Sequence, residues 1–195
     1  MATRAPNPAT PAGERILATA STLFYERGIR AVGVDVIALE AGTTKKTLYD
    51  RFGSKDALVA AYLVKRADRW RAYLDTALGR TGATGSERAL AVFAVAEEWA
   101  AANSRGCAFV NAYAEIGGTD HPANTVIRED KSFMHDLFVR LVAEAGVDDA
   151  DALGGQLHLL YEGAIVVSTA GGRSDAFGTA RDAARSLLET ATRRR

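Results

Sequence analysis

Hydrophobic residues recur at spacings of three and four along most of the chain, a pattern that predicts amphipathic α-helices. In residues 14–27 this spacing joins Ile16, Ala20 and Phe24, and Gly28 follows at the position where glycine commonly ends a helix. No run alternates apolar and polar residues convincingly enough to predict a strand. We therefore expect an all-α protein. Further helices are expected over residues 34–41, 45–52, 55–78, 86–103, 106–116, 122–145, 148–170 and 174–192.

The breaks in this helical pattern suggest an N-terminal tail followed by two folded parts. Residues 1–12 contain three of the four prolines and no apolar periodicity, which predicts a disordered tail. Three short helices with one shared core fit residues 13–54 as an N-terminal domain. The remaining helices are expected to form a second, helical domain over residues 55–195.

The organisation of residues 34–52 resembles a helix-turn-helix, in which two short helices meet at a tight turn. Gly42 lies in the turn, and Leu48 and Phe52 share the inward face of the second helix. The opposite face carries cations and hydroxyl groups, which suit DNA phosphates and base edges. The alternative is a solvated surface helix. The candidate DNA-binding residues are Thr43, Thr44, Lys45, Lys46, Thr47, Tyr49 and, for a phosphate contact from the next helix, Lys55.

Charge distribution agrees with an anionic partner for this part of the chain. The whole chain carries 24 basic and 24 acidic residues, whereas residues 1–70 hold 11 Lys and Arg against seven Asp and Glu. Asp50 lies four residues after Lys46, so it is expected either to orient that lysine or to accept a hydrogen bond from cytosine.

The segment from about Glu14 to Val64 resembles the DNA-binding domain of the TetR family of transcriptional regulators. The matching positions are Ile37-Ala38, Ala41-Gly42, Thr44, Thr47-Leu48-Tyr49, Phe52 and Ser54-Lys55. This resemblance implies a homodimeric repressor that binds an inverted repeat in double-stranded DNA and is released by a small, largely apolar effector. A DNA-binding regulator without an effector, whose second domain serves only dimerisation, is the alternative.

The resemblance also implies that the last two helices form a dimer interface. Apolar and small residues run along both at helical spacing, which would allow a four-helix bundle between two copies. The alternative is that the same stripe faces the core of its own chain. The candidate interface residues are Leu157, Leu160, Ala164, Ser168, Phe177, Ala180, Ala184 and Leu187.

An effector pocket would draw on aromatic residues with a few polar atoms, although core packing is the more common role for any one of these aromatics. Glu162 is the most informative polar candidate, with an ion pair to a nearby arginine as the alternative. The resemblance further implies that Asn111 and Glu115 organise a helix junction. The pocket candidates are Tyr62, Arg66, Trp70, Trp99, Phe109, Tyr113, Phe133, Tyr161 and Glu162.

Other classes of protein find little support in the sequence. An enzyme would require Cys107 as nucleophile and His158 as base, but no nucleophile, phosphate-loop or metal motif accompanies them. One cysteine and three separated histidines give neither a disulfide nor metal-ligand spacing. The longest apolar run, residues 89–96, is far shorter than the ~18 residues of a membrane span. We expect a cytoplasmic regulator with no cofactor, metal or membrane segment.

Overall fold

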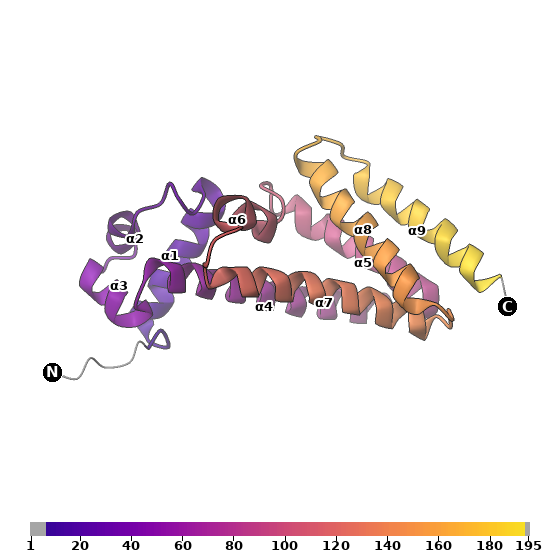
Figure 1. Cartoon of the computed structure of the whole chain (residues 1–195), viewed down its shortest axis with the longest axis horizontal. Helices are drawn as coiled ribbons and strands as arrows, with labels where there is room; N and C mark the ends of the chain where they lie inside the picture. Colours follow the sequence, from indigo (N-terminus) through magenta and orange to yellow (C-terminus); the bar gives the residue numbers. More distant parts are fainter. Residues whose placement is uncertain (1–6, 194–195) are drawn as a thin grey trace. The chain divides into compact units, whose positions relative to one another are not determined.

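The computed structural model describes residues 7–193, which form nine α-helices and no strand (Figure 1). This confirms the predicted all-α fold for the described part of the chain. The helices are α1 (Pro11–Arg27), α2 (Val34–Glu40), α3 (Lys45–Phe52), α4 (Lys55–Thr81), α5 (Gly85–Ala101), α6 (Ala108–Ile116), α7 (Ala123–Glu144), α8 (Ala150–Thr169) and α9 (Ala176–Thr192).

Helix α1 begins earlier than the hydrophobic pattern predicts. The Thr10 hydroxyl accepts a hydrogen bond from the Gly13 N–H at 3.1 Å, and Pro11 occupies the first turn, where its missing N–H has no consequence. The last two residues of the predicted tail are therefore helical. Residues 1–6 of that tail lie outside the described residues.

Helix α4 continues through Gly79, where the sequence predicted a break. Leu74, Ala77 and Leu78 are buried, and their packing outweighs the roughly 1 kcal/mol by which glycine disfavours a helix. The helix ends at Thr81, and Gly82 then takes a φ of 62°, a left-handed conformation that glycine adopts without strain.

Contacts between residues divide the chain into two compact units. The first contains the residues up to Asp68 together with Ala108–Arg128, and the second contains Arg69–Cys107 together with the residues from Glu129 on. Helix α6 thus belongs to the unit that holds α1, α2 and α3. The functional division at residues 54 and 55 stays a prediction.

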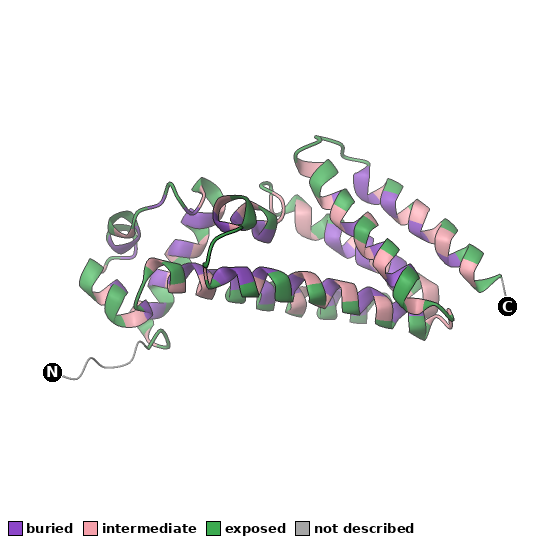
Figure 2. Ribbon diagram, viewed as in Figure 1, coloured by how far each residue is buried: buried purple, intermediate pink, exposed green. Residues whose placement is uncertain are grey.

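Each unit has its own buried core, visible as stripes along the helices (Figure 2). In the first, α1, α2 and α3 pack on one another through Ile16, Ile37 and Leu48, which are fully buried. In the second, α9 packs against α5 and α8, and Phe93 and Phe138 lie in the core with ring centroids 5.7 Å apart. Both cores are of the kind that binary hydrophobic patterning specifies.

Candidate functional site

The turn between α2 and α3 is fixed by its own backbone. The Thr43 N–H donates to the Ala38 carbonyl at 2.9 Å, and the Gly42 N–H donates to the Leu39 carbonyl at 3.1 Å. This pair of bonds is the Schellman arrangement, and it requires the positive φ of 60° that Gly42 adopts. The turn therefore sets the angle at which α3 leaves α2.

Helix α3 begins with a well-formed cap. The Thr44 hydroxyl accepts from the Thr47 N–H at 3.1 Å, and the two threonine hydroxyl oxygens lie 2.9 Å apart. Because the first N–H groups of a helix lack acceptors within it, this end carries a partial positive charge that suits phosphate. The cap is exposed, so the charge faces solvent.

The two faces of α3 are separated as a recognition helix requires. Leu48 and Phe52 are buried, whereas the side chains of Lys45 and Lys46 are 51% and 84% exposed. Tyr49 is exposed on the polar side, and Thr43 and Thr47 are half-buried. The structure thus brings the six candidates of residues 43–49 together around one helix.

Both lysines of α3 are paired with carboxylates. Lys45 Nζ lies 3.1 Å from Asp35 of α2, and Lys46 Nζ lies 2.7 Å from Asp50 Oδ2. The predicted orientation of Lys46 by Asp50 is present. The contact between Lys45 and Asp35 was not predicted, because it joins two helices whose relative angle the sequence does not define.

Lys55 lies differently from the phosphate-facing position predicted for it. Its Nζ donates to the Ile29 carbonyl oxygen at 2.7 Å and lies 6.0 Å from the centre of the Phe24 ring. Burial lowers the pKa of this ammonium group, an effect that Asp56 and Glu115 oppose. In this structure Lys55 therefore holds the loop after α1.

Glu115 of α6 binds the same loop. Its two carboxylate oxygens accept from the N–H groups of Ile29 and Arg30 at 2.8 and 2.7 Å. The sequence placed Glu115 at a helix junction but gave no indication of its partners, which lie 86 and 85 residues away. No pattern among neighbouring residues of the sequence predicts a contact over such a separation.

The pocket candidates are divided between the two units. Tyr62, Arg66, Phe109 and Tyr113 belong to the first. Tyr62 and Phe109 are buried there, the Arg66 guanidinium lies 5.0 Å from the centre of the Tyr25 ring, and Tyr113 is 57% exposed. Tyr62 packs in the core beside Phe24, at a centroid distance of 5.8 Å.

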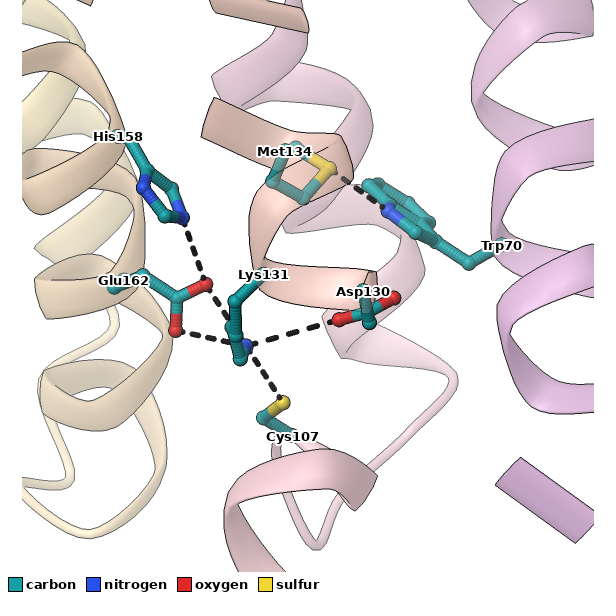
Figure 3. Close-up of polar contacts among 7 residues, drawn as sticks. All are labelled: Trp70, Cys107, Asp130, Lys131, Met134, His158 and Glu162. Carbon is teal, nitrogen blue, oxygen red and sulfur yellow. Dashed lines mark hydrogen bonds and ion pairs between the residues drawn. The ribbon is translucent and has the colours of Figure 1, made fainter. Parts of the chain in front are cut away.

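The remaining aromatic candidates gather in the second unit. The rings of Trp70 and Trp99 lie 5.4 Å apart, and Tyr73 stacks on Trp70 and lies tilted against Trp99. The indole N–H of Trp70 donates to Met134 Sδ at 3.3 Å (Figure 3). The guanidinium carbon of Arg71 lies over the Phe133 ring, 4.6 Å from the ring centre. The cluster is largely apolar, with few polar atoms at its edge.

Glu162 is the centre of a polar network in this unit (Figure 3). Its oxygens accept from Lys131 Nζ at 2.9 and 3.0 Å, and His158 Nε2 lies 3.5 Å from Oε1. Burial alone would raise the pKa of Glu162, but His158 and Lys131 bring it below its ordinary value. The expected alternative, an ion pair, is thus present, with a lysine instead of an arginine.

Lys131 connects this network to Cys107. Its Nζ lies 3.5 Å from Cys107 Sγ and 3.8 Å from Asp130 Oδ2 (Figure 3). Burial alone would lower the pKa of Lys131, but Cys107, Glu162 and Asp130 raise it to about 12. Cys107 therefore neighbours a cation, while His158, its candidate base, is engaged by Glu162.

The predicted dimer stripe is only partly available to a second chain. Leu157, Phe177 and Ala184 are buried within their own chain, which corrects their assignment to the interface, whereas Ala164 and Ala180 are buried but also line the groove between α8 and α9. Leu160, Ser168 and Leu187 are half-exposed. The buried residues of the stripe belong to the hydrophobic core of the second unit.

A second apolar face of α8 is open. Leu159 is 73% exposed, and Val166 and Val167 are also exposed. A groove between α8 and α9 is lined by Leu159, Leu160, Gly163, Ala183 and Leu187. A side chain added at Gly163 would meet nothing within 4 Å, so another helix has room to approach closely there.

Residues 7–193 offer no support for metal binding or for membrane crossing. Among them, no group of three or more His, Cys, Asp or Glu side chains is placed to hold a metal ion. No helix of that range combines the length and the apolar character needed to cross a membrane.

Comparison with known proteins points to the segment that contains α1 to α3. Residues 16–62 match the family described as bacterial regulatory proteins, tetR family. The chain is 43% identical over 54 residues to the HTH-type transcriptional activator FasR of Mycolicibacterium smegmatis, covering 28% of this chain and 25% of FasR. An uncharacterised HTH-type transcriptional regulator of Mycobacterium tuberculosis is 40% identical over 58 residues, covering 30% and 29%. These matches span about a quarter of the relatives' own length.

Solved structures extend the similarity to most of the chain. A TetR-family transcriptional regulator from Streptomyces coelicolor is 31% identical, with a TM-score of 0.83 over 92% of this chain and 95% of its own. A tetR-type transcriptional regulator from Streptomyces avermitilis is also 31% identical, with a TM-score of 0.81 over 94% and 99%. The helices outside residues 16–62 thus share the fold of such regulators.

Proposed function

Because the chain belongs to the TetR family of DNA-binding transcriptional regulators, we propose that it is a homodimeric repressor that binds an inverted-repeat operator. A small, largely apolar effector releases it from that operator. The observation that carries the DNA-binding part is α3, whose exposed cationic face and capped N-terminus stand on a fixed turn. Lys45, Lys46 and Tyr49 are assigned to DNA contacts, together with Thr43, Thr44 and Thr47.

A dimer is supported by the open face of α8 and α9. Two recognition helices enter successive major grooves only if they lie about 34–36 Å apart, which requires a fixed two-fold arrangement. The groove lined by Leu159, Gly163 and Ala183 offers an apolar surface with small residues, on which a second copy packs closely. The proposed interface is this face, with Leu160, Ser168 and Leu187 retained from the predicted stripe.

The effector part of the proposal rests on the aromatic residues of the second unit, where Trp70 is buried in the core and Tyr73 and Trp99 pack against it. Regulation by a ligand requires that it bind the released state better than the DNA-bound one. A regulator without effector remains the second candidate, favoured by the pairing of Glu162 with Lys131. That ion pair already satisfies the polar group expected to face a ligand.

Thermal unfolding in the presence of a panel of apolar and cationic compounds separates these two candidates. A ligand at 100 times its dissociation constant stabilises the folded state by about 2.7 kcal/mol. We expect at least one compound class to raise the melting temperature of the wild type. A panel in which no compound does so favours the regulator without effector.

Selection of bound duplexes from a random library tests the DNA-binding proposal. We expect an inverted repeat, and Lys45→Ala or Tyr49→Phe is expected to change the preferred bases and to weaken binding about tenfold. Lys55→Met tests whether Lys55 contacts phosphate, because it removes the ammonium group that bonds to the Ile29 carbonyl and retains the aliphatic stem. The dependence of its affinity on salt should equal that of the wild type.

Two results would contradict this assignment. A selected site without internal symmetry would remove the inverted repeat. If the slope of log affinity against log salt concentration were about one unit smaller in Lys55→Met than in the wild type, Lys55 would be shown to contact a phosphate. FasR is an activator, so the effect on transcription is measured in both directions, with reduced transcription expected on binding.

A further inference from the structure

The loop between α1 and α2 is held from outside the three DNA-binding helices. Helix α1 ends at Gly28, and the next two N–H groups, of Ile29 and Arg30, both donate to the Glu115 carboxylate of α6. Hydrogen bonds to an ionised acceptor are about twice as strong as neutral ones, so both N–H groups make strong bonds to this carboxylate. The Ile29 carbonyl accepts from Lys55, which fixes the same peptide from its other side.

Gly28 shows how closely the carboxylate and the loop are fitted together. Its φ of 89° is a conformation that residues with a side chain rarely adopt. A Cβ added there would lie 3.0 Å from Glu115 Oε1. The loop therefore adopts a backbone conformation that leaves room for the carboxylate and turns two successive N–H groups toward it.

The loop leads directly into a helix that has little support of its own. Helix α2 has seven residues, and its N-cap is Gly33, which provides no side-chain hydrogen bond. A helix this short is not stable in isolation, so its position depends on what holds its ends. Glu115 fixes Arg30, three residues before Gly33. The Schellman turn then sets the position of α3 relative to α2.

A second contact joins the residues after α6 to the DNA-binding part. His121 Nε2 lies 3.4 Å from Asp56 Oδ1, in the first turn of α4. The Ala123 N–H donates to His121 Nδ1 at 3.1 Å, so in the neutral ring Nε2 carries the proton and faces Asp56. Residues 108–128 thus hold the three-helix part at both the α1–α2 loop and the start of α4.

We propose that Glu115 is a positioning residue for DNA recognition, whose carboxylate holds the α1–α2 loop so that α2 and α3 present one geometry to the major groove. This inference rests on the proposed DNA-binding function and adds to it a residue that lies outside the helix-turn-helix. Glu115 touches no DNA in this scheme, and it acts only through the backbone of Ile29 and Arg30.

Glu115→Gln tests the proposal, because glutamine retains the size of the side chain but has a single acceptor oxygen. One of the two loop N–H groups then faces an amide NH₂ and loses its bond. The matched control is Glu97→Gln, which makes the same change at an exposed position of α5. Affinity for the selected operator, affinity for unrelated duplex, melting temperature and amide exchange at residues 29–52 are measured for both full-length variants.

We expect Glu115→Gln to remain folded, to bind the operator about tenfold more weakly and to bind unrelated duplex as the wild type does. Amide exchange should rise at Ile29 and Arg30 and through α2, while Glu97→Gln matches the wild type throughout. Equal loss of specific and unspecific binding, in proportion to the unfolded fraction, would overturn the proposal in favour of a purely structural role. Unchanged operator affinity would overturn it as well.

A second variant and a second measurement keep the test of Glu115 decisive. If Glu115→Gln does not fold, Glu115→Asp is used, which keeps the charge but shortens the reach, and the same loss of operator preference is expected. If the wild type selects no operator, the proposed function fails by itself. Amide exchange then still decides the inference, because exchange at residues 34–52 that is identical in Glu115→Gln and wild type contradicts any positioning by Glu115.

Discussion

Leu159→Glu is expected to convert the protein from a dimer to a monomer and to weaken operator binding by about 100-fold. Leu159 is 73% exposed on α8 and borders the groove with Gly163 and Ala183. A carboxylate at the centre of an apolar interface loses its hydration without gaining a partner. In the proposed dimer both recognition helices bind one operator, so separation of the subunits removes the gain from two simultaneous contacts.

Light scattering coupled to size exclusion measures the mass, and fluorescence anisotropy measures operator affinity. Thr76→Glu introduces the same charge at an exposed position of α4 and should remain dimeric. A dimeric Leu159→Glu with wild-type affinity would show that the two copies meet elsewhere. A monomeric variant with wild-type affinity would contradict the need for two linked recognition helices.

Glu162→Gln is expected to lower the free energy of unfolding by about 2 kcal/mol at pH 7, because it leaves the Lys131 ammonium without its main charged partner. For a chain of 195 residues this corresponds to about 4–8 °C in melting temperature. The contact is short, 2.9 Å, and both side chains are largely buried. Water therefore screens it less than a surface pair.

The pH dependence of this effect follows from the two pKa shifts. The pKa of Glu162 is lowered in the folded state, so its stabilisation is present above the unfolded value and is lost as the pH falls through the folded one. The pKa of Lys131 is raised to about 12, so its contribution is complete below the unfolded value of 10.5 and is lost as the pH rises through about 12. The difference between wild type and variant should be constant near neutrality and shrink in acid.

Denaturant unfolding from pH 3 to pH 9 measures this difference. Glu144→Gln, at an exposed position of α7, is the control and should change stability by less than about 0.5 kcal/mol. A difference between Glu162→Gln and wild type that does not vary with pH would show that the charge of Glu162 contributes nothing and that only its shape matters.

Local sequence signals were sufficient for the three-helix part. Gly28 and Gly42 end helices because they adopt positive φ values, and the Thr44 hydroxyl begins the next helix, so each boundary depends on residues within one turn of it. The exposed face of α3 follows from the same local geometry, since burial of Leu48 and Phe52 turns Lys45, Lys46 and Tyr49 outward.

Long-range contacts were not predictable in this way. Hydrophobic spacing identified α8 and α9 but did not distinguish Leu157, which is fully buried, from Leu159, which is exposed, because both sides of α8 are apolar. The direction of Lys55 depends on the Ile29 carbonyl, 26 residues earlier. Tertiary packing decides which way such a side chain points, and the helical spacing of residues in the sequence does not predict it.

In the proposed mode of DNA binding, the ion pairs of α3 would also affect how the protein searches a genome. Asp35 and Asp50 occupy Lys45 and Lys46 in the free protein, so any DNA phosphate has to displace a carboxylate first. Exposed pairs are worth at most about 1 kcal/mol each, which makes every encounter with DNA up to several-fold weaker. At an operator, contacts to the bases compensate for this loss of affinity, whereas DNA of random sequence provides no such compensation. We therefore expect the two aspartates to shorten the residence time on non-target DNA and to leave more of the protein free to sample new sites.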